Sequence, residues 1–259
     1  MTLYADSPLI DFDTRVDWQD SRKLLKVAFE TNIRSRTGVY DLPFGHIERA
    51  THRNTGFDQA KFEVCGHKWA DLSEGNYGVA LLNDCKYGYD IKGNVMRLSL
   101  LRSPVRPTLN SDLCEHIFSY ALLPHSGGWR EAQIDRHGYS FNISPLVVVK
   151  TPSSDGGSHV MPSTMSFVEV EAKATIIEAI KQSEDGNGLI IRTFDSHGTH
   201  DKVRFTFGVP LTHLGETNLL EEPLNDLGWE RSSFVAHFCP YEIKTFRFDV
   251  SQPKSIDST

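Results

Sequence analysis

Two short stretches of the chain combine side chains that can act as acids, bases or metal ligands. His197 and His200 flank a Gly-Thr pair and lie next to Asp201, a set of donors that a zinc ion accepts. Because Gly198 follows the first histidine directly, the spacing is also typical of a solvated hairpin turn, which is the interpretation we favour. We therefore predict no metal site in this chain.

The second stretch is Asp112-Leu113-Cys114-Glu115-His116, which brings an acid, a thiol and an imidazole close together in sequence. These groups suit general acid-base chemistry, or a cysteine nucleophile activated by a histidine. In an extended strand Asp112, Cys114 and His116 would share one face. Buried structural cysteines and histidines are more common than catalytic ones, however. We therefore assign no catalytic residue within these 259 residues.

Several well-known catalytic motifs are absent from the sequence. It contains no Gly-x-Ser-x-Gly elbow, no glycine-rich phosphate loop ending in Lys-Ser or Lys-Thr, and no His-Glu-x-x-His pair. Its four tryptophans and eight tyrosines have faces that can stack on sugars, but in β-sandwiches such residues mostly fill the core. From these residues alone, the chain is an all-β protein without an evident reaction.

Charge, cysteines and apolar runs limit the partners and the compartment. The formal net charge of −7 has both signs interspersed, which argues against nucleic acid as a partner. The first residues lack the order of a secretory signal, and the apolar run at 146–149 is too short to cross a bilayer. The four cysteines form no CxxC pair and are expected to be free thiols, although they permit three disulfide pairings. We expect a cytoplasmic protein without a membrane partner.

The elements that must position these residues are strands, because apolar side chains recur at every second position. Phe12, Val16 and Trp18 alternate with charged neighbours, as expected of a half-buried antiparallel strand. The same alternation recurs at 25–29, 203–209 and 246–250. Residues 168–180 fit either a strand or a helix, and the turn that follows favours a strand. The recurrence of apolar side chains at every second position therefore indicates two β-sandwiches.

Turn-forming residues separate these strands and divide the chain. Lys92-Gly93-Asn94 and Asp185-Gly186-Asn187-Gly188 are typical of hairpin turns. The stretch from Thr151 to Ser158 is rich in Pro, Ser, Asp and Gly and is typical of a linker. We predict a large β-domain over 1–151, a linker over 152–163 and a smaller β-sandwich over 164–259.

One long run is far more specific than these patterns. It is His67-Lys68-Trp69-Ala70-Asp71-Leu72-Ser73-Glu74, continued by Tyr77-Gly78-Val79-Ala80-Leu81-Leu82-Asn83-Asp84-Cys85-Lys86-Tyr87-Gly88. This run resembles a hallmark of the family 38 glycoside hydrolases, the α-mannosidases of the cytosolic and vacuolar type. Further ordered matches occur at 12–18, 48–54, 98–104 and 120–125, and weaker ones at 184–192, 217–221 and 240–246. The resemblance thus spans nearly the whole chain.

The resemblance implies a truncated member of that family. Its fold would be all-β: a β-supersandwich of the galactose mutarotase type that lacks its amino-terminal side, followed by a smaller carboxy-terminal β-sandwich. In the family, a zinc ion is bound by an amino-terminal domain, which would be the partner of this chain. We thus expect no cofactor here, and an α-mannosidase part that is inactive alone. A second copy of the chain, in a homo-oligomer, is an alternative partner, because an interrupted sheet exposes an unpaired edge.

The resemblance also points to one loop that contacts the substrate. Asn83, Asp84 and Lys86 match the run from which an acidic and a basic side chain approach the sugar in family members, so we predict that they bind a mannose-containing oligosaccharide. The alternative is a turn closed by a surface ion pair. Leu109 and Cys114 depart from the family pattern in a neighbouring loop. A stand-alone carbohydrate-binding sandwich is the alternative function.

Overall fold

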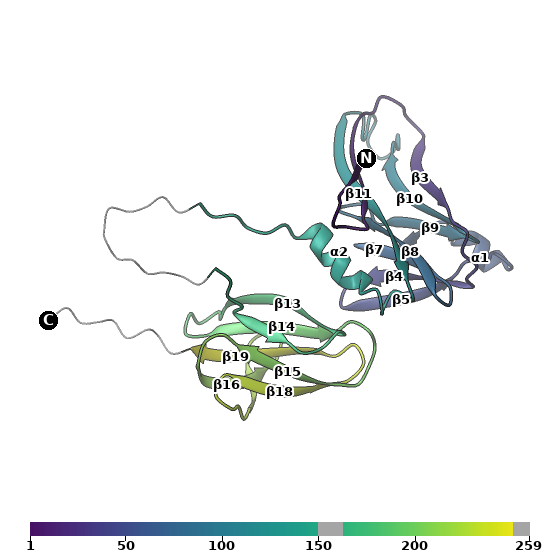
Figure 1. The fold of residues 1–259 in the computed structure, drawn as a ribbon. Helices are drawn as coiled ribbons and strands as arrows, with labels where there is room; N and C mark the ends of the chain where they lie inside the picture. The colour runs from purple at the N-terminus through teal and green to yellow at the C-terminus, as the bar shows by residue number, and fades with distance from the viewer. Residues whose placement is uncertain (150–162, 251–259) are drawn as a thin grey trace. The chain divides into compact units, whose positions relative to one another are not determined.

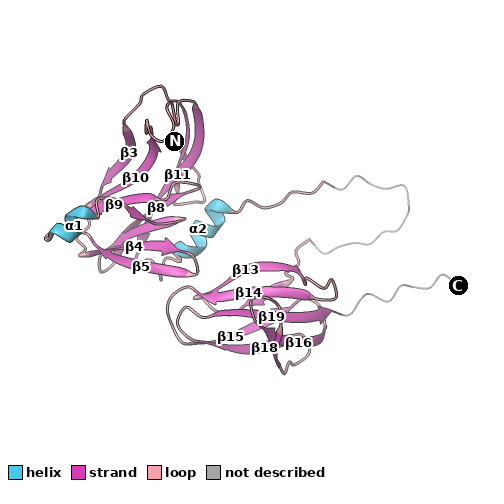
Figure 2. Cartoon of the chain, turned by 180° about the vertical axis from the view of Figure 1, so that it is seen from behind, coloured by secondary structure: helices cyan, strands magenta, loops and turns pink. Residues whose placement is uncertain are grey.

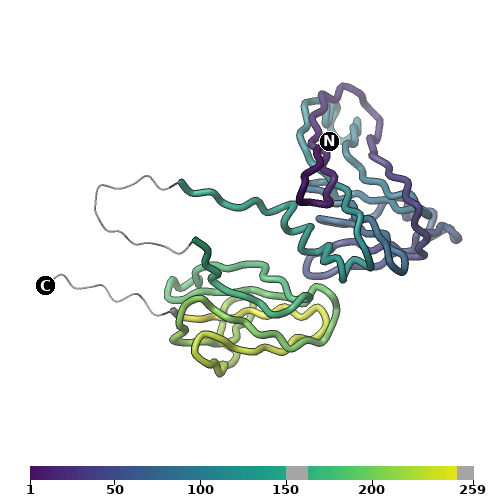
Figure 3. Tube along the Cα trace, in the orientation of Figure 1, coloured from purple at the N-terminus to yellow at the C-terminus, as the bar shows by residue number. Residues whose placement is uncertain are grey.

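The computed structural model describes residues 1–149 and 163–250, and strands dominate both parts (Figures 1 and 2). The chain divides into two compact units, Met1–Leu146 and Val147–Thr259, each formed by one continuous stretch of sequence, as the colour gradient along the trace shows (Figure 3). The predicted all-β class is confirmed. Apart from Ser163, the predicted linker 152–163 lies outside the described residues, so the domain limits stay a prediction.

The first unit contains a seven-stranded and a four-stranded antiparallel sheet. The larger sheet has the order β1-β2-β11-β8-β7-β4-β5. Its strands are β1 (Thr2–Leu3), β2 (Ile10–Asp17), β11 (Glu115–Ser126), β8 (Tyr77–Asn83), β7 (Trp69–Ser73), β4 (Thr37–Leu42) and β5 (Gly45–Ala50). The smaller sheet consists, in order, of β3 (Leu24–Glu30), β10 (Val95–Arg102), β9 (Gly88–Lys92) and β6 (Val64–Cys65).

Strand β8 is buried on both of its faces. Val79 and Leu81 belong to a core with side chains of both sheets, including Tyr89, Met96 and Leu98. Ala80 and Leu82 point the other way, into a second core on the outer face of the larger sheet. This second core contains Ile134 of α2 (Ile134–Asn142), a helix that packs against β7 and β8 (Figure 1). Burial on both faces explains the continuous apolar run of β8.

The second unit contains a three-stranded and a five-stranded sheet. The smaller sheet consists, in order, of β12 (Val168–Val170), β15 (Asp201–Phe207) and β18 (Ser233–Phe238). The larger consists, in order, of β13 (Thr175–Gln182), β14 (Leu189–Asp195), β19 (Ile243–Val250), β16 (Leu211–Thr217) and β17 (Pro223–Asp226). Phenylalanines from β15, β18 and β19 fill the core, with the rings of Phe205 and Phe234 stacked at 4.9 Å between centroids.

Most of the predicted strands and turns are confirmed. Phe12, Thr14 and Val16 of β2 are half-buried, whereas Asp13, Arg15 and Asp17 are exposed. The stretch 168–180 contains strand as predicted, but it forms two strands, β12 and the first part of β13, with a bend at 173–174 between them. Gly93 and Gly186 take positive φ angles of 60° and 76° in the turns between β9 and β10 and between β13 and β14. Neither α2 nor the short helix α1 (Gly56–Ala60) is among the predicted elements, although Thr55 and Asp58 form a capping box at the start of α1.

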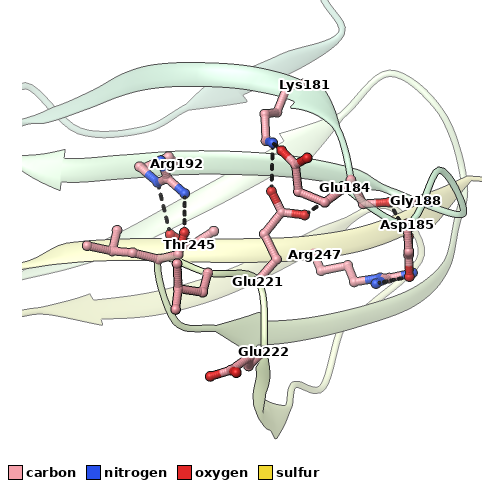
Figure 4. A network of polar contacts seen from close by, with 12 residues as sticks. Lys181, Glu184, Asp185, Gly188, Arg192, Glu221, Glu222, Thr245 and Arg247 are labelled. Atoms are coloured by element: carbon pink, nitrogen blue, oxygen red, sulfur yellow. Dashed lines mark hydrogen bonds and ion pairs between the residues drawn. The ribbon is translucent and has the colours of Figure 1, made fainter.

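A network of charged side chains fixes the turn between β13 and β14 in the second unit (Figure 4). Asp185 accepts hydrogen bonds from Arg247 Nη1 and Nη2 at 2.8 and 3.3 Å. Lys181 pairs with Glu184 and, at 2.8 Å, with Glu221. Because each of these charges has an opposite partner, the network is best understood as support for the hairpin.

Candidate functional site

The loop that connects β8 to β9 is held rigidly by Asn83, the last residue of β8. The Asn83 side chain has no exposed surface. Its Nδ2 donates to the His67 carbonyl at 2.8 Å and to the Tyr89 hydroxyl, and its Oδ1 accepts from the Lys86 amide at 2.5 Å. The Asn83 side chain therefore closes the loop from inside rather than facing a ligand.

Asp84 ties the loop to the neighbouring strand β11. Its amide donates to the Ser119 carbonyl at 3.2 Å, and its Oδ2 accepts from the Ser119 amide at 2.8 Å. The second carboxylate oxygen, Oδ1, is buried and has no hydrogen bond within the described part of the chain. This oxygen thus keeps its capacity to accept a hydrogen bond.

Lys86 does not form the ion pair with Asp84 that the structural alternative required. Its Nζ lies over the ring of Phe118, 4.5 Å from the centroid, and none of the ion pairs described between residues 1 and 149 joins it to an acid. A cation over an aromatic face keeps its N–H donors available. Between the two residues, partial burial and the Asp84 carboxylate raise the pKa of the Cys85 thiol to about 11.

A second polar group supports the loop from the side of α2. Asn142 Nδ2 donates to the Asn83 carbonyl at 3.0 Å. Lys68 Nζ lies 3.3 Å from Asp41 and 4.4 Å from the centroid of the Tyr139 ring. Burial raises the pKa of Asp41, and the ammonium of Lys68 opposes that rise. The loop and Asn83 before it are therefore fixed by groups from β11 and α2 and by the His67 carbonyl, which lies just before β7.

A buried polar pair lies on the outer face of the same sheet. His125 Nε2 is 2.7 Å from Asp71 Oδ2, and the Ser73 hydroxyl donates to Asp71 Oδ1. The side chains of His125 and Asp71 are 6% and 0% exposed. In this arrangement the carboxylate lies between the hydroxyl and the imidazole, so the histidine does not contact the hydroxyl as a general base would. We assign the pair a structural role.

The clusters singled out in the sequence form no reactive centre. Asp112 has a positive φ of 63° in a turn before β11, so residues 112–116 do not form the extended strand in which the three side chains would share one face. Cys114 Sγ does lie 3.6 Å from His116 Nε2, but that nitrogen also contacts the Asp112 carbonyl at 2.9 Å. His197 is buried rather than solvated, because the turn after β14 folds its ring inward, whereas His200 is exposed.

Neither a metal-binding cluster nor a disulfide occurs within the described residues 1–149 and 163–250. No group of three or more His, Cys, Asp or Glu side chains there could hold a metal ion. The four cysteines are exposed and free of disulfides. None of the helices in these ranges has the length and apolar character needed to span a bilayer.

Comparisons with known proteins agree across both units. Residues 1–110 match the model of the glycosyl hydrolases family 38 C-terminal domain, and residues 174–246 match that of the family 38 C-terminal beta sandwich domain. Alpha-mannosidase G of Dictyostelium discoideum is 41% identical over 249 residues, which are 95% of this chain and 23% of that protein. Alpha-mannosidase 2C1 of Homo sapiens is 36% identical over 98% of this chain and 24% of that protein.

A solved structure shares the fold. An alpha-mannosidase from Enterococcus faecalis superposes with a TM-score of 0.79 at 21% identity, over 95% of this chain and 28% of that one. The chain spans about a quarter of the length of the relatives it matches.

Proposed function

Because the chain belongs to glycosyl hydrolase family 38, whose two C-terminal domains it carries, we propose that it is the carboxy-terminal part of an α-mannosidase acting on terminal α-mannosyl residues. In this proposal the chain supplies domain packing and part of the substrate rim. The glycosidic bond is broken by an amino-terminal half of the kind that makes up most of the relatives' length.

The observation that carries the rim assignment is the state of the 84–87 loop. Asp84 Oδ1 has no hydrogen bond among the described groups, and Lys86 has no acidic partner there. In this proposal the ammonium of Lys86 binds the sugar hydroxyl groups directly, and Asp84, whose Oδ1 is buried, contributes the negative charge of a carboxylate in the same loop. Asn83 is given a positioning role, because its side chain is buried within the loop.

The zinc chemistry implied by the family is not assigned to these residues. The described side chains do not fit a zinc site, since no set of three metal-binding groups converges. Retaining hydrolysis also needs two carboxyl groups about 5 Å apart across the sugar. We therefore expect the chain alone to be inactive, and we place both the zinc and the nucleophile in the amino-terminal half.

The unpaired edge of the smaller sheet supports the proposal that the partner belongs to the same enzyme. Strand β3 pairs with β10 on one side and with no described strand on the other. Leu25, Val27 and Phe29 of β3 are only partly buried against the core. An edge of this kind needs a cover, and we propose that the amino-terminal half provides it.

The state of the four cysteines supports a proposal for the cellular compartment. All four thiols are exposed and unpaired, which suits the reducing cytoplasm better than an oxidising compartment. We therefore propose a cytoplasmic enzyme of mannose metabolism.

The test is a chimera in which this chain replaces the matching region of Dictyostelium alpha-mannosidase G. We expect the chimera to hydrolyse an aryl α-mannoside, and the 259-residue chain alone to release no product even with added zinc. In the chimera, Asp84→Asn and Lys86→Met should each lower kcat/KM by about 10- to 100-fold, as expected for a lost charged hydrogen bond. Lys92→Met, which changes an exposed residue at the far end of β9, is the matched control.

Two results would count against the proposal. Hydrolysis by the chain alone would contradict the assignment of catalysis to the amino-terminal half. A chimera that melts like the parent enzyme but releases no product would contradict the scaffold role.

A further inference from the structure

A surface groove of about 570 Å³ crosses the end of the four-stranded sheet next to the 84–87 loop. Tyr89, Leu101 and the partly buried Leu25 point from this sheet into the core, whereas Val64 packs partly against that core and also lines the groove. Their neighbours alternate to the opposite face, where the groove is lined by Leu24, Cys65, Gly88 and Arg102. The groove therefore lies on the outer face of the sheet, separate from Asp84 and Lys86.

Two exposed aromatic side chains form its apolar walls. Phe62 and Tyr87 line the groove, with 61% and 52% of their surfaces exposed. The ring of His67 stacks on one face of Tyr87, with 5.0 Å between centroids and an angle of 26°. The Gly66 amide donates to the Tyr87 carbonyl at 3.1 Å. Tyr87 is thus held in place before any ligand arrives.

Two charged side chains supply polar groups at the same place. The Glu63 carboxylate lies over Gly88, and its Oε2 is fixed 3.1 Å from Lys26 Nζ. Arg102 is exposed, and its guanidinium forms no ion pair or hydrogen bond with any other side chain that the structure describes. One carboxylate oxygen and a whole guanidinium therefore remain available to a ligand.

We propose that this groove is a sugar-binding subsite that takes a mannosyl pyranose ring. The apolar face of the ring lies against Tyr87 and Phe62, and its hydroxyl groups bond to Glu63 and Arg102. The choice of mannose rests on the proposed function, whereas the preference for a sugar rests on the aromatic and charged lining.

A protein surface is a poorer occupant of this groove than a sugar. A large dry interface would take Arg102 out of water without a counter-charge, which is costly. A sugar leaves the guanidinium partly hydrated and satisfies it through hydroxyl groups.

The test is calorimetric titration of the full 259-residue chain with methyl α-mannoside and with α-mannobiose. We expect saturable binding with a Kd on the order of 1 mM. Tyr87→Ala, Phe62→Ala and Arg102→Ala should each weaken it about tenfold. Tyr77→Ala is the control, because Tyr77 is 41% exposed at the opposite end of β8, outside the groove. Unfolding temperatures of the variants verify that each is folded.

Three outcomes would overturn the inference. The first is the absence of saturable heat with the folded wild-type chain. The second is binding that Asp84→Ala abolishes and Tyr87→Ala leaves unchanged, which places the sugar on the loop. The third is a change of sedimentation in Tyr87→Ala without any effect on sugar binding, which makes the groove a contact between chains.

The proposed function can fail independently of this inference. If the chimera released no product but the chain still bound mannoside through Tyr87, the assignment of the groove would stand. If the groove bound no sugar, hydrolysis of an aryl mannoside by the chimera would still support the proposed function.

Discussion

Gly78 allows two polar side chains to meet across a strand. It lies on β8 opposite Ser73 of β7 and opposite His125 of β11. Because Gly78 has no side chain, the His125 ring can reach over β8 to Asp71. A Cβ at this position would lie 2.6 Å from His125 Nε2 and still closer to the Ser73 hydroxyl.

We predict that Gly78→Ala destabilises the protein by about 1–3 kcal/mol, the usual cost of overpacking. The added methyl group would push His125 away from Asp71 and leave a buried carboxylate without its partner. Gly75→Ala is the matched control, since no atom lies within 4 Å of the Cβ it would add. Denaturant unfolding measures both, and equal free energies of unfolding would refute the account.

Cys85 should react slowly with alkylating reagents despite its exposed position. Its pKa is raised to about 11 by partial burial and by Asp84. Only the thiolate reacts, so the alkylation rate should increase about tenfold per pH unit between pH 8 and pH 10. Peptide mass spectrometry after iodoacetamide treatment measures this rate. A plateau near pH 9 would contradict the prediction, and Asp84→Asn should move the plateau to lower pH.

At the scale of elements, the turn between β13 and β14 depends on a carboxylate. Hydrogen bonds from Ser183, Arg247 and the Asn187 amide hold the pKa of Asp185 well below its ordinary value. A carboxylate whose pKa is lowered in the folded state contributes its full stabilisation at pH values above the pKa of the unfolded chain, roughly 3.9. This stabilisation is lost as the pH falls below that value.

Asp185→Asn should therefore lower the unfolding temperature of the second unit at pH 7 and have less effect at pH 3. High salt should also reduce the difference, because the Asp185 side chain is 49% exposed. Scanning calorimetry measures both effects. Asp6→Asn, which alters an exposed carboxylate in the first unit, serves as the control. If Asp185→Asn lowered the unfolding temperature more at pH 3 than at pH 7, the predicted direction of the pH dependence would be wrong.

The strands could be predicted because their apolar period follows directly from burial on one face. Strand β2 shows this alternation in its sequence, and so does β15. Helix α2 could not be predicted, because it begins at Gln133, in a left-handed conformation, without a side-chain cap. Its apolar residues Ile134 and Phe141 are too few to show a helical period, and α2 is placed by the outer core of the large sheet.

At the scale of the whole molecule, each unit has its own core. The core between the sheets of the first unit includes Leu81, and the core of the second includes Phe205. Among the described residues, no core cluster has members from both units. Each unit therefore has the means to fold as a separate cooperative body.

We predict two calorimetric transitions that core substitutions affect separately. Leu81→Ala should cost the first unit about 2–5 kcal/mol, and Phe205→Ala should cost the second about 3–5 kcal/mol. Each variant should shift one transition and leave the other in place. A single transition that both substitutions lower would show that the two units unfold together.

The candidate site shows the limit of sequence reasoning. The sequence located the 84–87 loop through its resemblance to a family, but it did not indicate that Asn83 is fully buried. Nor did it single out Phe62, Glu63 and Arg102, which lie apart in sequence and share a groove only because β6, β9 and β10 are neighbours in the sheet. Tertiary pairing creates such a site, and local patterns do not report it.

The double burial of β8 has a consequence for ligand binding. A strand that is packed on both faces does not slide or fray easily. The loop after Asn83 is also rigid, because three hydrogen bonds of the Asn83 side chain fix it to the strand. The amide protons of Asp84 and Lys86, which are donated to Ser119 and Asn83, should exchange with solvent more slowly than the other amides of this loop. A sugar that reaches Asp84 and Lys86 would meet a surface whose conformational entropy was already lost during folding.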